Sequence, residues 1–258
     1  MQSKFRIGFV NMIKQLYLFG IDLRSVYNLR NYPKYIFQKI KWKKSGGKIT
    51  KSLVVLNDYD LNSGINKGHY FHQDLIVAQL IFKNNPQKHI DIGSRVDGFV
   101  SHVASFRLIE VFDIRPMPTS FHSNIKFTQL DLSKSNKINL TDSLSCLHTV
   151  EHFGLGRYGD DIDIDGHIKG INILVKMLKS KGRLYISLPI GVKNEVHFNA
   201  HRIFHPQYLL SVQIIKNELS LLRFDYIDDD GDVYLDVKIK NAIDKTTYGC
   251  GIYTFQKK

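Results

Sequence analysis

Lys88-His-Ile-Asp-Ile-Gly-Ser-Arg-Val-Asp-Gly98 has the pattern of a buried strand that breaks into a glycine-hinged turn. The amphipathic segment 99–106 follows at once, so the order is strand, turn and helix. Asp113 ends the next strand-like run about 20 residues on, where a carboxylate can accept hydrogen bonds from both hydroxyls of a ribose. The sequence therefore predicts the first elements of an α/β nucleotide-binding sheet.

Two common phosphate-binding turns share this shape, and the spacing argues against both. A P-loop needs Lys-Ser or Lys-Thr after its last glycine, whereas Phe99 and Val100 follow Gly98. A dinucleotide turn needs a glycine where Arg95 stands, because the backbone there approaches a pyrophosphate. S-adenosylmethionine (SAM) carries no phosphate and tolerates a less glycine-rich turn, so SAM is the ligand that we expect. Asp91 would then face the methionine amine.

A third strand is predicted over residues 125–130, and it ends at Asp131 and Leu132. The Asp131 carboxylate can accept the adenine amino group, with Leu132 against the ring. Each acidic residue alone also fits a helix cap. Because ligands of open α/β sheets lie outside the carboxyl ends of the strands, the joint spacing of Asp91, Asp113 and Asp131 favours one extended ligand.

The remaining patterns continue the sheet toward the C-terminus. We predict a short strand at 54–56, strands at 143–148 and 183–188, helices at 75–82, 168–178 and 207–215, and strand-like segments at 219–228, 233–239 and 248–255. The last three segments predict an antiparallel C-terminal hairpin. The expected architecture is α/β and Rossmann-like, with seven strands in a mostly parallel sheet.

Positive charge is concentrated at the N-terminus. Residues 1–51 hold nine lysines and three arginines against one acid, and so carry +11 of the net charge of +12. This composition predicts a basic amphipathic helical segment over residues 1–50 and a second domain over 51–258. Such a segment can lie on an anionic membrane surface, or pack its apolar stripe on the main domain. No nucleic-acid-binding signature accompanies the charge, so we expect no nucleic-acid partner.

One apolar helical face is predicted within this basic segment. Its residues are Phe5, Phe9, Ile13, Leu16 and Leu23. No stretch reaches the roughly 18–20 apolar residues that a spanning helix needs, and no secretion signal is recognisable. The two cysteines make no disulfide framework. We therefore expect a cytoplasmic protein, peripheral at the inner face of a membrane if the basic segment binds there.

The stretch His148-Thr-Val-Glu-His152 also spells the inverted zinc-protease motif. That reading needs both histidines on a helix and a third ligand downstream, for which Glu195 and Glu218 are available. His148 instead ends the predicted fourth strand, and glycines follow from Gly154. The acidic loop, residues 154–165, holds four aspartates without the spacing of a calcium loop, so no metal site is expected.

Several longer motifs resemble one family. They are Gly68-His-Tyr-Phe-His-Gln-Asp, Asp91-Ile-Gly-Ser-Arg-Val-Asp-Gly-Phe, Phe112-Asp-Ile-Arg-Pro, Glu151-His-Phe-Gly-Leu-Gly-Arg-Tyr-Gly-Asp and Phe198-Asn-Ala-His-Arg-Ile-Phe-His-Pro. They cover roughly residues 66–210 and are similar to the uncharacterised DUF268 family. The order of elements resembles the class I SAM-dependent methyltransferase fold, and the stretch 148–152 resembles the fourth-strand motif of its ubiquinone-methyltransferase-like branch. The chain departs from the common glycine pattern at Arg95 and Asp97.

Bacterial members of this family resemble enzymes of surface-polysaccharide biosynthesis. The resemblance implies a SAM-dependent O-methyltransferase that acts on a sugar of a surface polysaccharide, or on its nucleotide- or lipid-linked precursor. The alternatives are a catalytically silent SAM-fold module that scaffolds a membrane-associated glycan assembly, and methylation of a small phenolic or quinone-like acceptor.

Two sets of site residues follow from these expectations. The expected cofactor-binding residues are Asp91, Gly93, Ser94, Gly98, Asp113, Ile114, Asp131, Leu132 and His148. The expected catalytic residues are His152 as general base, His201 as the second candidate for that role, and Glu151 as the group that orients the base.

Overall fold

The computed structural model describes residues 20, 23–64, 66–119 and 122–258. The chain divides into two compact units, residues 1–65 and 66–258. The predicted division near residue 50 stays a prediction. The predicted apolar face from Phe5 to Leu16 lies outside the described residues.

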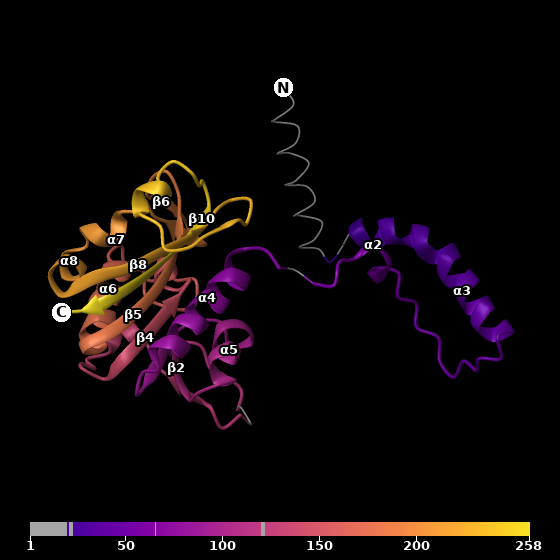
Figure 1. Ribbon diagram of the computed structural model, residues 1–258, viewed down its shortest axis with the longest axis horizontal. Helices are drawn as coiled ribbons and strands as arrows, with labels where there is room; N and C mark the ends of the chain where they lie inside the picture. Colours follow the sequence, from indigo (N-terminus) through magenta and orange to yellow (C-terminus); the bar gives the residue numbers. More distant parts are fainter. Residues whose placement is uncertain (1–19, 21–22, 65, 120–121) are drawn as a thin grey trace. The chain divides into compact units, whose positions relative to one another are not determined.

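The first unit contains short helices joined by irregular chain (Figure 1). Its elements are α2 Leu23–Asn28, η1 Leu29–Asn31, α3 Tyr32–Lys44 and η2 Asp58–Asp60. The strand predicted at residues 54–56 is wrong, since these residues are irregular. Val54 and Val55 are exposed, and none of the strands that the structure describes pairs with them.

The second unit is built on one sheet of eight strands. They are β1 His89–Ile92, β2 Ile109–Asp113, β3 Ile125–Gln129, β4 Thr141–Leu147, β5 Leu178–Ile190, β8 Leu219–Ile227, β9 Val233–Tyr234 and β10 Gly249–Lys257. Their order is β3-β2-β1-β4-β5-β10-β8-β9. The first five pair in parallel, whereas β10 pairs antiparallel with both β5 and β8. The seven strands other than β9 match the predicted mostly parallel sheet with antiparallel C-terminal strands. The two-residue strand β9 adds an eighth strand at the edge of this sheet, beside β8.

Helices cover both faces of this sheet, which explains why all four residues of β1 are buried. The helical elements are α4 His69–Asn84, η3 Val96–Val100, α5 Ser101–Ala104, η4 Leu132–Lys134, η5 Val150–His152, α6 Gly166–Met177, α7 Tyr208–Ser211, α8 Gln213–Glu218 and η6 Ile239–Asn241. Side chains of α6, α7 and α8 form one hydrophobic cluster with the sheet, and side chains of α4, η3 and α5 form another.

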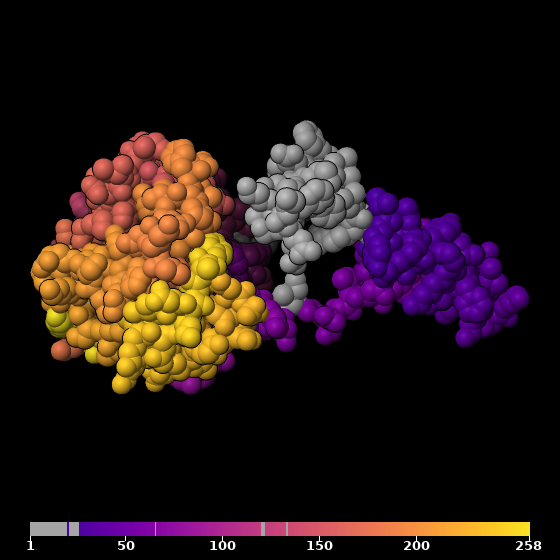
Figure 2. All heavy atoms as spheres, turned by 90° about the horizontal axis from the view of Figure 1, so that it is seen from above, coloured from indigo at the N-terminus to yellow at the C-terminus, as the bar shows by residue number. Residues whose placement is uncertain are grey.

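Two predicted C-terminal elements differ from the structure. The helix expected over 207–215 is interrupted at Val212, whose extended backbone separates α7 from α8. The strand expected over 233–239 ends at Tyr234, because pairing with β8 stops there. Figure 2 shows yellow C-terminal residues beside orange residues on the surface of the second unit.

The carboxyl ends of β1, β2, β3 and β4 open toward the same edge of the sheet, because these strands are parallel. The turn after β1 and the acidic loop lie at this edge. So does a two-stranded hairpin of β6 Glu195–His197 and β7 His201–Ile203. The fold therefore brings together the segments that the sequence marked for ligand binding.

Candidate cofactor and acceptor site

The turn after β1 requires glycine at two positions. Gly93 has φ +70°, and a Cβ there would lie 2.5 Å from Cγ2 of Thr149. A Cβ on Gly98 would lie 2.5 Å from Oδ2 of Asp74. Gly93 thus combines a left-handed backbone conformation, which favours glycine, with a close approach that a side chain would block, whereas at Gly98 only the close approach applies. The predicted glycine hinge has a steric cause at both residues.

Asp91 holds the turn from beneath and does not reach a cavity, contrary to the expectation that it faces the ligand. Its side chain is 0% exposed. It accepts hydrogen bonds from the backbone N–H of Ser94 (3.0 Å), from Oγ of Ser94 (2.6 Å) and from Oγ of Ser145 (2.5 Å). Burial raises the pKa of Asp91 to about 6, although these hydrogen bonds oppose the rise. The carboxylate positions the turn because its oxygens are occupied within the protein.

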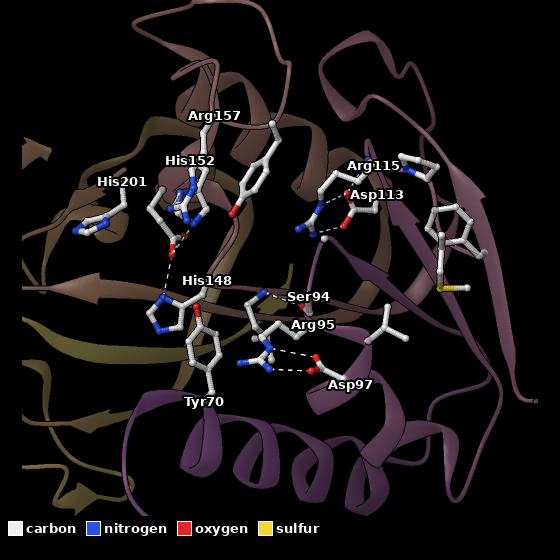
Figure 3. A pocket seen from close by; sticks show the side chains of 18 of the residues that line it. Tyr70, Ser94, Arg95, Asp97, Asp113, Arg115, His148, His152, Arg157 and His201 are labelled. Carbon is white, nitrogen blue, oxygen red and sulfur yellow. Dashed lines mark hydrogen bonds and ion pairs between the residues drawn. The ribbon is translucent and has the colours of Figure 1, made fainter. Parts of the chain in front are cut away.

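A cavity of about 750 Å³ opens at the carboxyl edge of the sheet (Figure 3). Its walls come from the turn after β1, the end of β2, the residues after β4, the acidic loop and β7. The predicted site residues that line it are Gly93, Ser94, Asp113, His148, Glu151, His152 and His201. Residues far apart in the sequence, as predicted, meet at one place.

A second cavity of about 270 Å³ adjoins the first, and the two have lining residues in common. The shared residues are Gly93, Asp113, Arg115, His148, His152 and Tyr158. Ile114, Leu132 and Phe153 give the smaller cavity apolar walls, and Asp131 supplies a carboxylate. The predicted residues Ile114, Asp131 and Leu132 therefore lie together, in a space that suits a flat aromatic ring with one polar edge.

The carboxylate of Asp113 is engaged by Arg115. Nε of Arg115 donates to Oδ1 (3.0 Å) and Nη2 donates to Oδ2 (2.6 Å). The guanidinium also lies 4.7 Å from the ring centroid of Tyr158, on the acidic loop. The pKa of Arg115 is raised by this hydrogen bonding to Asp113. Sequence reasoning did not identify Arg115, and only its place two residues after Asp113 could have suggested it.

Arg95 stands where a dinucleotide turn has glycine, and it places a cation at the cavity wall. Its guanidinium pairs with Asp97 (2.9 Å) and lies 5.1 Å from the ring centroid of Tyr70 on α4. The pair is solvent-exposed, so the bridge itself adds little stability. Arg95 keeps further N–H donors for a ligand.

His148 and Glu151 form a buried pair in the wall of the larger cavity. Nδ1 of His148 lies 2.9 Å from Oε1 of Glu151. Burial lowers the pKa of His148, but Cys250 and Glu151 outweigh burial, so the pKa lies well above its usual value. Nε2 of His148 and Oε2 of Glu151 have no hydrogen-bond partner among the described residues. Glu151 therefore orients His148 directly.

His152 is held differently. Its Nδ1 lies 2.7 Å from the backbone oxygen of Ala200, so Nδ1 is the donor and Nε2 carries the lone pair in the neutral ring. Nε2 lies 3.8 Å from Oε1 of Glu151. Burial lowers the pKa of His152 and outweighs Glu151 and the hydrogen bond to Ala200, which raise it; Arg157 and His148 also lower it. The neutral ring is the form that can accept a proton at Nε2.

His201 lies on β7 and lines the larger cavity. Its ring contacts the rings of His197 and Tyr248, each at a centroid distance of 5.2 Å. Burial lowers the pKa of His201, and the neighbouring His197 adds to this effect. Its Nε2 is buried and has no hydrogen-bond partner in the described part of the chain.

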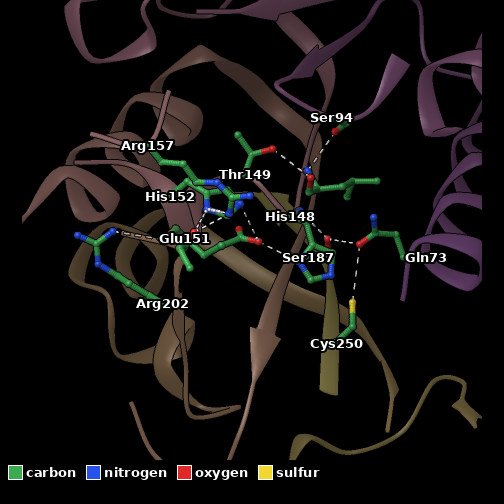
Figure 4. A network of polar contacts seen from close by, with 12 residues as sticks. Gln73, Ser94, His148, Thr149, Glu151, His152, Arg157, Ser187, Arg202 and Cys250 are labelled. Atoms are coloured by element: carbon green, nitrogen blue, oxygen red, sulfur yellow. Dashed lines mark hydrogen bonds and ion pairs between the residues drawn. The ribbon is translucent and has the colours of Figure 1, made fainter. Parts of the chain in front are cut away.

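A polar network ties the wall of the cavity to the core (Figure 4). Oγ of Ser187 on β5 donates to Oε1 of Gln73 on α4 (2.5 Å) and accepts from the backbone N–H of His148 (3.0 Å). The backbone N–H of Leu147 donates to Oγ of Ser94 (3.2 Å). These bonds connect α4, the turn after β1 and the end of β4, so they fix the positive φ of +47° at His148.

The zinc-protease reading fails on backbone structure. His148 follows a strand directly, and His152 ends the three-residue turn η5, so the histidines do not share an established helix. Within the described ranges, no group of three or more His, Cys, Asp or Glu side chains is arranged to hold a metal ion.

Solved structures share the fold of this chain. N-methyltransferase NodS from Bradyrhizobium japonicum WM9, in complex with S-adenosylhomocysteine (SAH), is 12% identical, with a TM-score of 0.50 over 73% of this chain and 87% of NodS. The Burkholderia thailandensis 1,6-didemethyltoxoflavin-N1-methyltransferase, with bound 1,6-didemethyltoxoflavin and SAH, is 11% identical, with a TM-score of 0.50 over 72% and 78%. The [4+2]-cyclase SpnF is 11% identical, with a TM-score of 0.53 over 76% and 85%.

These likenesses confirm the predicted class I methyltransferase fold. Residues 114–218 match the model of the family described as "Caenorhabditis protein of unknown function, DUF268", which confirms the predicted resemblance over that range. No curated protein matches the chain by sequence. SpnF, a [4+2]-cyclase, shows that the fold alone does not establish the reaction.

Proposed function

We propose that the chain is a SAM-dependent O-methyltransferase that acts on a sugar of a surface polysaccharide, or on its nucleotide- or lipid-linked precursor. The observation that carries this proposal is the position of His152, which lines both cavities and whose Nδ1 lies 2.7 Å from the backbone oxygen of Ala200, an arrangement that leaves the lone pair of the neutral ring on Nε2. A nucleoside in the smaller cavity and an acceptor in the larger one would meet beside this nitrogen.

The residues fit the parts of SAM one by one. Asp131 accepts a hydrogen bond from the adenine amino group, with Ile114 and Leu132 against the ring faces. Asp113 lies in the wall shared by the two cavities, where it accepts hydrogen bonds from the ribose hydroxyls. Arg95, in the larger cavity, pairs with the methionine carboxylate.

The protein supplies orientation and a base. When bound, SAM provides a methyl group on a sulfonium, and its transfer to an acceptor oxygen leaves SAH. Holding the two reactants in line contributes about 7–11 kcal/mol to such a step. A sugar hydroxyl is a weak nucleophile near neutral pH, so Nε2 of His152 takes its proton, and the carboxylate of Glu151 at 3.8 Å stabilises the imidazolium that forms.

The first unit favours a membrane location for this activity. Five lysines lie on α3 without an acidic residue, and Phe37 and Trp42 are 67% and 58% exposed. A basic helix with exposed aromatic side chains can bind an anionic membrane surface, where each lysine contributes about 1 kcal/mol. We therefore propose a peripheral protein at the cytoplasmic face of a membrane that carries the acceptor. In the part of the chain that the structure describes, no helix has the length and apolar character to cross a bilayer.

The test is methyl transfer from isotopically labelled SAM into glycans extracted from the source cells. The proposal expects label in a glycan fraction, with a mass gain of one CH₂ for each transfer, and no label with a His152→Gln variant that still binds SAH. The competing function is a catalytically silent module. It predicts SAH binding without transfer to any fraction.

A further inference from the structure

Three arginines line the larger cavity, and two of them are neutralised by carboxylates. Arg95 pairs with Asp97 at 2.9 Å, and Arg115 pairs with Asp113 at 2.6 Å. Arg157, on the acidic loop, forms no ion pair with any described residue. The larger cavity therefore contains one guanidinium whose charge has no carboxylate beside it.

The contacts of Arg157 leave most of its donors available. Its Nη1 donates to the backbone oxygen of Ala200 (2.7 Å) and lies 3.5 Å from Nδ1 of His152, and its guanidinium lies 5.2 Å from the ring centroid of Tyr158. A guanidinium has five N–H donors in a fixed planar arrangement. These contacts hold the side chain at the cavity wall and involve Nη1 and the face of the guanidinium, so the N–H groups on Nε and Nη2 can bind an oxyanion.

A second polar group without a hydrogen-bond partner among the described residues lies nearby. His201 directly follows Ala200, the residue to which Arg157 is bonded, and its Nε2 is buried without a partner among the described residues. Leaving a buried polar atom unpaired costs about 1–3 kcal/mol, so a partner supplied by a bound ligand would stabilise this nitrogen. Figure 3 shows Arg157 and His201 across the cavity from Arg95 and Asp97.

We propose that Arg157 and His201 bind an oxyanion on the acceptor, so that the acceptor is a sugar carrying a phosphate or a carboxylate group rather than a neutral sugar. This inference rests on the proposed methyltransferase function and names its substrate class. An arginine binds either group through two parallel hydrogen bonds, and a neutral histidine donates a third. The cavity places this anion beside His152, so the same contact would orient the neighbouring hydroxyl toward the base.

The test uses the full-length protein saturated with SAH. Inorganic pyrophosphate, glucuronate and neutral glucose are titrated in turn, and binding is followed by calorimetry. The inference expects at least one of the two anions to bind and glucose not to bind. Binding of pyrophosphate would assign the anion to a nucleotide- or lipid-linked phosphate, and binding of glucuronate would assign it to a uronic acid.

Variants distinguish anion binding at Arg157 and His201 from general attraction of anions to a positively charged protein. Arg157→Gln should weaken anion binding about 10- to 100-fold, as expected for loss of a charge-assisted contact, and should leave SAH affinity unchanged. His201→Ala should weaken it less. Lys193→Gln is the matched control, because Lys193 is a 75% exposed cation near the hairpin that does not line the larger cavity. Its anion binding should equal that of the wild type.

Two results would overturn the inference while leaving the methyltransferase proposal intact. They are SAH binding without binding of either anion, and equal anion binding by the wild type and Arg157→Gln. A folded wild-type protein that does not bind SAH would instead remove the proposed function, and the inference with it.

Discussion

Nδ1 of His152 donates a 2.7 Å hydrogen bond to the backbone oxygen of Ala200, although 48 positions separate the two residues. This bond selects the tautomer with the lone pair on Nε2. Ala200 lies just before β7, so the hairpin fixes the ring of a residue that comes from η5, after β4. The proposed base is thus oriented by the backbone, and Glu151 at 3.8 Å from Nε2 is left to stabilise its charged form.

Replacing the base tests this assignment. His152→Gln should lower kcat by about 10²–10⁴-fold, because general-base catalysis contributes that much to such steps. SAH affinity should stay at the wild-type value, measured by calorimetry. Turnover equal to the wild type would remove His152 from the mechanism.

The pH dependence of kcat/KM follows from the same residue. Burial lowers the pKa of His152 from its ordinary value, with help from Arg157 and His148, and it outweighs Glu151 and the hydrogen bond to Ala200, which raise the pKa, so the neutral base predominates at pH 7. Activity should be constant around neutral pH, and should decrease in the acidic range as Nε2 becomes protonated. In Arg157→Gln the loss should begin at a higher pH, because a neighbouring positive charge has been removed. An acid limb that begins above pH 7 in the wild type would contradict this account.

Gly93 can be tested against a matched glycine. Gly93→Ala places a Cβ 2.5 Å from Cγ2 of Thr149 at φ +70°, whereas Gly159→Ala meets nothing within 4 Å at φ +82°. Both substitutions share the backbone strain, of order 1 kcal/mol. Only Gly93→Ala should also lose SAM binding, measured by equilibrium dialysis. Equal losses in the two variants would show that the contact with Thr149 is unimportant.

Asp91 should affect the affinity for the cofactor although its buried side chain does not contact it. Asp91→Ala leaves the buried N–H and hydroxyl donors of Ser94 without their acceptor and removes one of the two partners of the Ser145 hydroxyl, which keeps His89 at 3.1 Å; an unpaired buried donor costs about 1–3 kcal/mol. The free energy of unfolding in urea and the affinity for SAH should both fall. The control is Asp97→Ala, whose side chain is 74% exposed and which should change the free energy of unfolding by less than about 1 kcal/mol. Full stability in Asp91→Ala would refute the proposed role in the turn.

Local pattern was enough to predict the strand and turn at 88–98, and to place Asp113 and Asp131 at one edge of the sheet. These features depend on strand order and on residue types within single elements. The burial of Asp91 could not be predicted, because its partner Ser145 lies 54 residues away on β4. That Arg157 forms no ion pair with any described residue likewise could not be predicted, because it depends on which carboxylates the fold brings near it. Residues 54–56 show the converse case, in which a suitable pattern formed no strand: Val54 and Val55 are exposed, and none of the described strands pairs with them.

The central claim is that the two joined cavities bind SAM, with its nucleoside between Asp113 and Asp131. Equilibrium dialysis of the full-length protein against labelled SAM tests this most directly. We expect one bound molecule per chain, and affinity at least tenfold weaker in both Asp113→Ala and Asp131→Ala, as for loss of a hydrogen bond to a charged group. A folded protein that retains no SAM, or binding unchanged in both variants, would contradict the account.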